Sequence, residues 1–328
     1  DVCTNRGAQT WLLQVTAHAH LTKMAGNESC KPSFEGLIPF KYQGETFETY
    51  TRVYGELKDS NHTPVVALHG GPGLSHDYLR PLSDLSTNYG FPVIMYDQIG
   101  NAKSTHLKDK PETFWTIDLF IDELENILKH FGVSDDFHLL GHSWGGILGL
   151  EFEVRRKPKG LKKFVSASSL ASTALWMRST MELAQTLPQE VGEGLAVGMK
   201  DPKKYWEALQ QFHAHYGCDV LSNRSLNNTW IPSFGCSENT VVAGNAHPWC
   251  LSWQNPQRLV YHRSYRLHLV RIPVFMINGR KDIAQDYVVR PLFDGITKVK
   301  WVTFENSSHM PLMEERERFM KLVSEFLL

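Results

Sequence analysis

Apolar residues follow two different patterns along the chain. Residues 36–57 alternate apolar and polar positions around a Gln-Gly pair, which predicts a β-hairpin. Later segments are short and continuously apolar, as strands are when a parallel sheet buries both of their faces. These segments are residues 64–68, 92–96, 137–140, 163–166 and 273–277, and a last strand is expected at residues 299–304.

Helical spacing separates these strands. In residues 113–131 apolar positions recur every three or four residues, and Thr113 stands where a helix N-cap belongs. Alternating strands and helices predict the α/β class, with a mostly parallel central sheet flanked by helices. The alternation stops from about residue 172 to about residue 262, where five tryptophans gather, and it resumes near residue 273.

This interruption divides the chain into four parts. We predict an N-terminal segment (1–35), the first part of the α/β core (36–171), a mainly helical cap inserted between two strands (172–262) and the second part of the core (263–328). The length of 328 residues and the hydrophobic content of 42% suit one domain with a large insertion, or two domains.

Charge and hydropathy exclude two classes of partner. Lys and Arg number 34 against 35 Asp and Glu, so the basic stripe of a nucleic-acid-binding protein is not expected. No apolar run approaches the roughly 18 residues that a membrane span requires. The sequence carries no signal for the oligomeric state. A small molecule or a short peptide is therefore the expected partner.

Sequons and cysteines favour an exported protein. The chain begins at Asp1, as a chain does after removal of a signal peptide. Cys3 and Cys30 bracket the N-terminal segment, and the other three cysteines have room for one further disulfide. We expect a secreted or extracytoplasmic glycoprotein; the alternative is a cytoplasmic protein with reduced cysteines. The glycosylation candidates are Asn27, Asn61, Asn223 and Asn227.

The hexapeptide GHSWGG (141–146) stands between a predicted strand and a helical pattern. An alcohol is a poor nucleophile at neutral pH unless a neighbouring base takes its proton. A serine hydrolase therefore needs a histidine, a carboxylate that orients it, and donors for the oxyanion. A serine between glycines at a strand-to-helix turn is the pattern of a nucleophile elbow. Ser143 is thus the candidate nucleophile; the alternative is an ordinary turn residue.

The acid and the base follow later strands in the required order. Asp282 comes directly after the strand at 273–277, and His309 comes after the strand at 299–304. Because catalytic groups collect at the carboxyl ends of parallel strands, we expect both to converge on Ser143. Asp286 is a rival acid that lies further from its strand. Asn306 is also a sequon, but a glycan three residues before His309 would crowd the site, so we expect it to stay unmodified.

A glycine loop completes this set of candidates. HGGPG (69–73) follows the strand at 64–68, and its glycines allow backbone amides to turn toward a ligand. We expect the amides of Gly71 and Trp144 to form the oxyanion hole. The loss of one such donor typically raises the barrier by about 2.7 to 4 kcal/mol.

These segments resemble the proline iminopeptidase branch of the α/β-hydrolase superfamily. The resemblance rests on HGGPG, YDQIGNAKST (96–105), GHSWGG and SSHMPLMEE (307–315), and it covers about residues 36–170 and 270–328. It implies the α/β-hydrolase fold with a helical cap, and the release of N-terminal residues, often proline, from short peptides or amides. It also implies that no metal or organic cofactor is used.

The resemblance assigns a role to each candidate. It implies that Ser143 is the nucleophile, Asp282 the orienting acid and His309 the base, with the oxyanion held by the amides of Gly71 and Trp144. It further implies that Cys218 is a cap cysteine outside the disulfides. The expected pairs are then Cys3 with Cys30 and Cys236 with Cys250.

Two departures from the family bear on the substrate. In this branch a glutamate often follows the catalytic aspartate, and a second lies in a cap segment shaped like M-x-G-P-x-E-F; both hold the free ammonium of the substrate. Here Ile283 follows Asp282, and residues 241–253 read VVAGNAHPWCLSW. Burying an ammonium without a partner is costly. Other acids of the cap either replace these anchors or are solvated surface charges. They are Glu190, Glu193, Glu207 and Glu238.

The sequence therefore leaves three functions open. The leading prediction is a serine hydrolase that cleaves a small amide or an N-terminal peptide residue through an acyl-enzyme. The alternatives are an esterase or other amine-independent hydrolase of small acyl substrates, and a non-catalytic binding protein on the same fold. The candidate substrate-binding residues are Gly70, Glu207 and Trp249.

Overall fold

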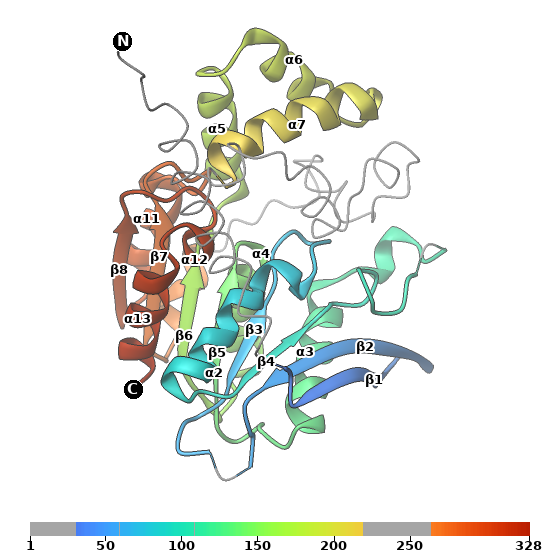
Figure 1. Cartoon of the computed structure of the whole chain (residues 1–328). Coiled ribbons are helices and arrows are strands. Elements are labelled where there is room, and N and C mark those ends of the chain that lie inside the picture. Colours follow the sequence, from blue (N-terminus) through green and yellow to red (C-terminus); the bar gives the residue numbers. More distant parts are fainter. Residues whose placement is uncertain (1–30, 59, 108, 219–263) are drawn as a thin grey trace, which may run out of the picture.

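The computed structural model describes residues 31–58, 60–107, 109–218 and 264–328. These residues form one eight-stranded sheet in the order β1-β2-β4-β3-β5-β6-β7-β8, with helices on both faces (Figure 1). The first two neighbour pairs of that order, β1·β2 and β2·β4, are antiparallel, and every other pair is parallel. The strands are β1 (Phe34–Tyr42), β2 (Glu45–Tyr54), β3 (Val65–Leu68), β4 (Val93–Tyr96), β5 (Phe137–His142), β6 (Leu161–Ala167), β7 (Val274–Gly279) and β8 (Val299–Phe304).

The predicted hairpin and strands are present. Gln43 and Gly44 connect β1 to β2 with φ angles of 48° and 83°, the positive values that a tight hairpin turn of type I′ requires at both central positions. Every residue of β3, β4, β5 and β7 is buried, as expected for strands covered on both faces. The order of the strands confirms the predicted α/β class.

Two apolar layers cover the sheet. On one face α3, α4 and α11 pack against alternate strand residues such as Val66 and Leu68. On the other face η1, α2 and α13 pack against Val65 and Ala67, which point the opposite way. The bounds of these elements are η1 (His76–Ser83), α2 (Asp84–Tyr89), α3 (Ile117–His130), α4 (Trp144–Arg156), α11 (Asp286–Gly295) and α13 (Arg316–Leu327).

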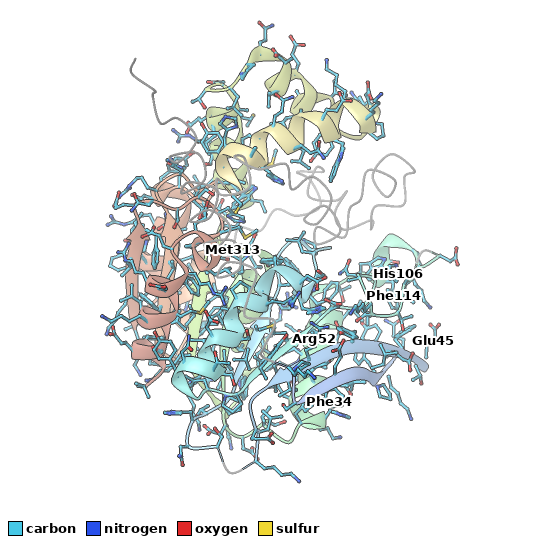
Figure 2. The ribbon with its side chains drawn as sticks, in the orientation of Figure 1. Phe34, Glu45, Arg52, His106, Phe114 and Met313 are labelled. Carbon is cyan, nitrogen blue, oxygen red and sulfur yellow. The ribbon has the colours of Figure 1, made fainter. Side chains whose placement is uncertain are left out.

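The predicted start of the helix at 113–131 was wrong. Helix α3 begins at Ile117, and the hydroxyl of Thr116 caps it by accepting the Leu119 amide at 3.1 Å. Thr113 belongs to a separate 3-10 turn, η2 (Glu112–Phe114). Phe114, labelled in Figure 2, packs edge-on against the rings of Tyr42 and Phe47 in the β1–β2 hairpin.

Three helices rise from the end of β6 and stand above the sheet (Figure 1). They are α5 (Thr173–Ala184), α6 (Gln189–Val197) and α7 (Pro202–Tyr216), with the 3-10 turn η3 (Gly198–Lys200) between the last two. After residues outside the described ranges, η5 (Ser264–Leu269) leads back to β7, and the short helix α12 (Pro311–Glu314) follows β8. The predicted domain boundaries stay a prediction.

Several predicted residues lie outside the described ranges. They are Trp249, Glu238, the cysteines of both predicted disulfides (Cys3, Cys30, Cys236 and Cys250) and the sequons at Asn27, Asn223 and Asn227. Among the helices that the structure does describe, none combines the length and the apolar character of a membrane span.

Candidate active site

Ser143 occupies a strained turn between β5 and α4. Its φ and ψ angles are 55° and −116°, a region that residues with a Cβ rarely adopt. Backbone hydrogen bonds hold this conformation: the Ser143 amide donates to the Ala167 carbonyl at 2.8 Å, and its carbonyl accepts the Gly146 amide at 2.9 Å. The hydroxyl of Ser169 also donates to that carbonyl at 2.9 Å.

The glycines on either side of Ser143 permit a very close approach of backbones. A Cβ at Gly141 would lie 2.2 Å from the carbonyl oxygen of Gly145. A Cβ at Gly145 would lie 2.1 Å from the carbonyl oxygen of Leu68 in the neighbouring strand β3. No side chain fits at either position, so the pattern in the sequence follows from the packing of the turn.

Asp282 and His309 form a buried pair. His309 Nδ1 lies 2.7 Å from Asp282 Oδ1, and the Asp282 side chain is completely buried. The backbone amides of Ala284 and Gly279 also donate to this carboxylate, at 2.8 and 3.3 Å. Because a carboxylate only accepts, Nδ1 of His309 donates and Nε2 carries the lone pair that can take a proton.

The rival acid lies in a different network. Asp286 Oδ2 accepts from the guanidinium of Arg280 at 2.6 Å, and its Oδ1 accepts from the Asn278 amide nitrogen at 3.0 Å. The structure therefore brings Asp282, and not Asp286, to His309.

His142 connects the elbow, the glycine loop and the histidine loop. Its Nε2 lies 2.8 Å from the carbonyl oxygen of His309, so Nε2 donates and Nδ1 accepts. The Tyr78 hydroxyl donates to Nδ1 at 3.0 Å and itself accepts the Gly70 amide at 2.5 Å. Burial, and next the charge of His309, lower the pKa of His142 to about 3. A neutral His142 is what this chain of hydrogen bonds requires.

The glycine loop packs directly against the elbow. A Cβ at Gly70 would lie 3.1 Å from the Cβ of Ser143. Gly71 has a φ of 108°, and a Cβ there would lie 2.5 Å from the Gly73 amide nitrogen. Gly71 and Ser143 line the same cavity. The loop thus brings Gly71 beside the candidate nucleophile.

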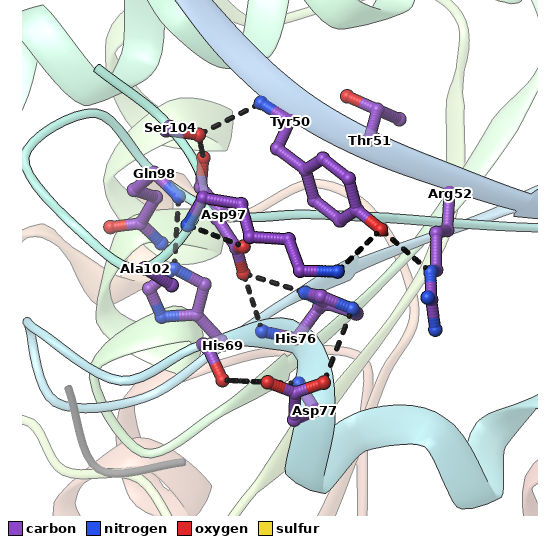
Figure 3. A network of polar contacts seen from close by, with 12 residues as sticks. Tyr50, Thr51, Arg52, His69, His76, Asp77, Asp97, Gln98, Ala102 and Ser104 are labelled. Atoms are coloured by element: carbon purple, nitrogen blue, oxygen red, sulfur yellow. Dashed lines mark hydrogen bonds and ion pairs between the residues drawn. The ribbon is translucent and has the colours of Figure 1, made fainter. Parts of the chain in front are cut away.

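The segment at 96–105 contacts His69 and His76, which stand at the start of the glycine loop and just after it (Figure 3). Asp97 is buried and accepts from the backbone amide and from Nδ1 of His76, at 2.7 and 2.8 Å. Burial alone would raise the pKa of Asp97, but the hydrogen bonds and charge of His76 lower it below its ordinary value. Asp97 therefore stays an anion that fixes the start of η1.

Two neighbours of Asp97 reach the candidate site. His69 Nε2 accepts the Gln98 amide at 3.0 Å, and its Nδ1 donates to the Gly70 carbonyl at 2.9 Å. The Gln98 side-chain oxygen accepts the indole N–H of Trp144 at 3.0 Å. Gln98 thereby contacts both His69 of the glycine loop and Trp144 of the elbow helix.

A cavity of about 1320 Å³ opens above Ser143. Its floor includes Gly71, Ser143 and Ile283, and its walls come from α5, α6 and α7. Ile283 is 4% exposed, packs in a cluster with residues of these helices, and accepts a hydrogen bond at its carbonyl from Ser179 of α5 at 2.7 Å. The position where relatives of the predicted branch often carry glutamate is therefore apolar here.

The predicted substrate contacts differ in their placement. Gly70 is buried in the glycine loop, as described above. Glu207 is exposed on α7 and is not among the residues that line the cavity. Glu190 is likewise exposed outside the lining. Glu193 does line the cavity, but its side chain is 53% exposed and lies 3.6 Å from Lys204. Cys218 is buried just after α7.

Three residues near His309 were not predicted from the sequence. The rings of Trp176 and His309 lie 5.5 Å apart between centroids, and the His309 amide donates to the Tyr216 carbonyl at 3.2 Å. His213 lines the cavity, and burial, followed by the charge of His309, lowers its pKa to about 4. Each contact joins the histidine loop to a helix far away in the sequence, so no local pattern announces it.

Comparison with known proteins agrees with this architecture. Residues 63–316 match the model of the α/β-hydrolase fold family, so the chain belongs to the α/β hydrolases. The proline iminopeptidase of Clostridioides difficile (strain 630) is 33% identical over 299 residues, which are 89% of this chain and 97% of that protein. Within the α/β hydrolases, the chain thus groups with the proline iminopeptidases.

Two solved structures extend the comparison. The crystal structure of proline iminopeptidase from Mycobacterium smegmatis has a TM-score of 0.72 and 31% identity, and the match covers 90% of this chain and 97% of that one. The crystal structure of VinJ has a TM-score of 0.73 and 32% identity, covering 90% and 99% of the two chains. The likeness therefore spans nearly the whole length of both proteins.

Proposed function

We propose that this chain is a serine hydrolase that cleaves a small amide, or the N-terminal residue of a short peptide, through an acyl-enzyme on Ser143. The observation that carries the proposal is the buried contact of 2.7 Å between Asp282 and His309, which directs Nε2 of the histidine to act as a base. The names of the relatives, proline iminopeptidases, support cleavage after an N-terminal proline.

The reaction follows from the roles of these groups. His309 Nε2 takes the Ser143 proton as Oγ attacks the carbonyl carbon, and Asp282 stabilises the imidazolium that forms. The Gly71 and Trp144 amides hold the oxyanion. His309 then gives the proton to the leaving amine. Water, activated by the same histidine, hydrolyses the ester bond to Ser143 and frees the acid.

A second candidate is an amine-independent hydrolase, and Ile283 favours it. An aminopeptidase needs a partner for the substrate ammonium, because burying an unpaired ammonium is costly. The side chain of Ile283 offers only apolar atoms beside Asp282. Glu193, the carboxylate among the described residues of the cavity wall, is engaged by Lys204.

A panel of three substrates separates the two candidates. We would compare a prolyl arylamide, its N-acetylated form and a short acyl ester, with Ser143→Ala as the control for background hydrolysis. A preference of tenfold or more for the free amine supports the aminopeptidase and sinks the amine-independent candidate. If no substrate with a free amine is hydrolysed, the aminopeptidase is contradicted and the amine-independent hydrolase is supported. Failure of a fluorophosphonate to label Ser143 would contradict both and favour a non-catalytic binding protein.

We also propose that the protein is exported and glycosylated. Asn61 is exposed, so its sequon is accessible. In the sequon at Asn306 the hydroxyl of Ser308 is buried and donates to Glu314 at 2.6 Å, which supports the expectation that this site stays unmodified. Peptide mapping of secreted material without reduction would test these sites and both disulfides. A glycan on Asn306, or a disulfide to Cys218, would contradict the proposal.

A further inference from the structure

The cavity above Ser143 is deep. It contacts α5 at Trp176, near the sheet, and at Gln185, just after the last turn. These two positions are nine residues apart, which corresponds to about 14 Å along a helix. The cavity therefore extends from the candidate nucleophile to α6, and its volume of about 1320 Å³ exceeds the range of about 300–1,000 Å³ usual for small-molecule pockets.

The part of the cavity wall that the structure describes is mostly apolar. Its members include Met177 and Met181 of α5, Leu195 of α6, and Leu209 and Phe212 of α7. Met181 is the most exposed of these apolar side chains, at 58% accessible. Among the described lining residues the charged ones are Glu193 and Lys200, which are exposed and belong to α6 and η3.

Two glycines of α6 differ in what surrounds them. A Cβ at Gly194 would lie 2.5 Å from the Cβ of Ala208, so that glycine lets α6 and α7 pack closely. A Cβ at Gly192 would meet no described atom within 4 Å, and Gly192 lines the cavity. A glycine inside a helix is destabilising by roughly 0.5–1 kcal/mol relative to alanine. Close packing against α7 explains why residue 194 is a glycine. It does not explain the glycine at 192, which borders the open cavity.

We propose that this cavity is a subsite for an extended, uncharged apolar chain of the substrate, attached next to the bond that Ser143 attacks. The inference rests on the proposed serine hydrolase function and holds for either of its two candidates. Met177, Met181 and Leu209 would contact the chain along its length. Gly192 leaves room at the far end, where a larger side chain would shorten the subsite.

Two series of esters test the length and the position of this chain. In one series the acyl group grows by single methylenes from acetyl to dodecanoyl with nitrophenol as leaving group. In the other the acyl group is prolyl, with its free amine, and the alcohol grows by single methylenes. In one of the series we expect kcat/KM of the wild type to rise about three- to fourfold per methylene until the cavity is filled. The series that rises identifies which side of the bond occupies the subsite.

Variants at the far end locate the subsite. Gly192→Phe should lower kcat/KM for the longest chains far more than for the shortest ones and so abolish the rise, whereas the matched control Gly192→Ala should keep most of the rise. Ala196→Trp, at an exposed residue that also lines the cavity, is a second blocking variant in case Gly192→Phe does not fold. Thermal unfolding would verify that each variant is folded.

The failures of the two proposals are distinguishable. Equal turnover of short and long chains in both series, with an active wild type, overturns the subsite and leaves the hydrolase proposal standing. A rise that persists unchanged in both folded blocking variants also overturns it. If wild type and Ser143→Ala hydrolyse every ester equally, the proposed function fails and the subsite fails with it.

Discussion

The backbone of Ser143 is strained. Substitutions at this position can therefore test the hydroxyl and the backbone conformation separately. A non-glycine residue at such φ and ψ angles is strained by about 1–3 kcal/mol. Alanine has the same restriction as serine, so Ser143→Ala should abolish hydrolysis and leave the thermal midpoint nearly unchanged. Ser143→Gly should also be inactive but should unfold at a higher temperature. A large loss of stability in Ser143→Ala would mean that the hydroxyl is a structural group.

Tyr78 is predicted to position the site without touching the substrate. Tyr78→Phe keeps the ring but leaves the Gly70 amide and His142 Nδ1 without their partner. We expect kcat to fall roughly tenfold to a hundredfold with little change in KM, because small displacements of catalytic groups lower the rate by such factors. The free energy of unfolding should drop by about 1–3 kcal/mol. Tyr89→Phe on α2 is the matched control, and equal kinetics for the two variants would contradict the role of Tyr78.

Residues that follow a strand were easier to predict than residues that support them. The sequence pointed to Asp282 and His309 because each comes just after an apolar strand, and the structure brings the two into contact. Tyr78, Trp176 and His213 were missed because their contacts join segments that are distant in the sequence. The sequence carried no sign of those contacts.

At the scale of elements, strands were predicted better than cap helices. The predicted strand at 299–304 has the bounds of β8, although β8 is an edge strand in which only Phe304 is buried. Strands β3, β4 and β7, each predicted from a continuous apolar run, are buried throughout. Helix α5 gave no such signal. Some of its apolar side chains, such as Met177 and Met181, face the cavity instead of the core. They weaken the helical spacing of apolar residues by which a helix is predicted. A helix that lines a binding cavity departs from the pattern of a helix that covers a core.

Alanine should have opposite effects on stability at the two glycines of α6. Gly192→Ala should raise the free energy of unfolding by about 0.5–1 kcal/mol, since alanine favours the helix and meets no described atom. Gly194→Ala should lower it, because the new methyl group would collide with Ala208 and push α6 away from α7. Chemical unfolding of both variants tests this. Equal effects of the two substitutions would mean that α6 and α7 do not pack as the structure describes.

For the whole molecule, four buried titratable groups predict an optimum of stability near pH 7. Burial lowers the pKa of His138, His142 and His213 from 6.5 to about 4, 3 and 4. Below pH 6.5 the unfolded chain therefore binds protons that the folded chain does not, and stability falls on acidification. Burial raises the pKa of Glu123 from 4.5 to about 8. Between these values the folded chain holds a proton that the unfolded chain has released, so this contribution is lost as the pH rises toward 8.

The two effects have opposite signs and different ranges, which makes them separable. Between pH 4.5 and 6.5 the three histidines outnumber Glu123, so the thermal midpoint should rise with pH. Above about pH 7 the unfolded histidines have lost most of their protons and Glu123 outweighs them, so the midpoint should fall toward pH 8. Glu123→Gln should remove this fall, and His138→Phe, which lies outside the candidate site, should make the acid side less steep. A wild-type midpoint that keeps rising to pH 8 would show that Glu123 is ionised in the folded protein.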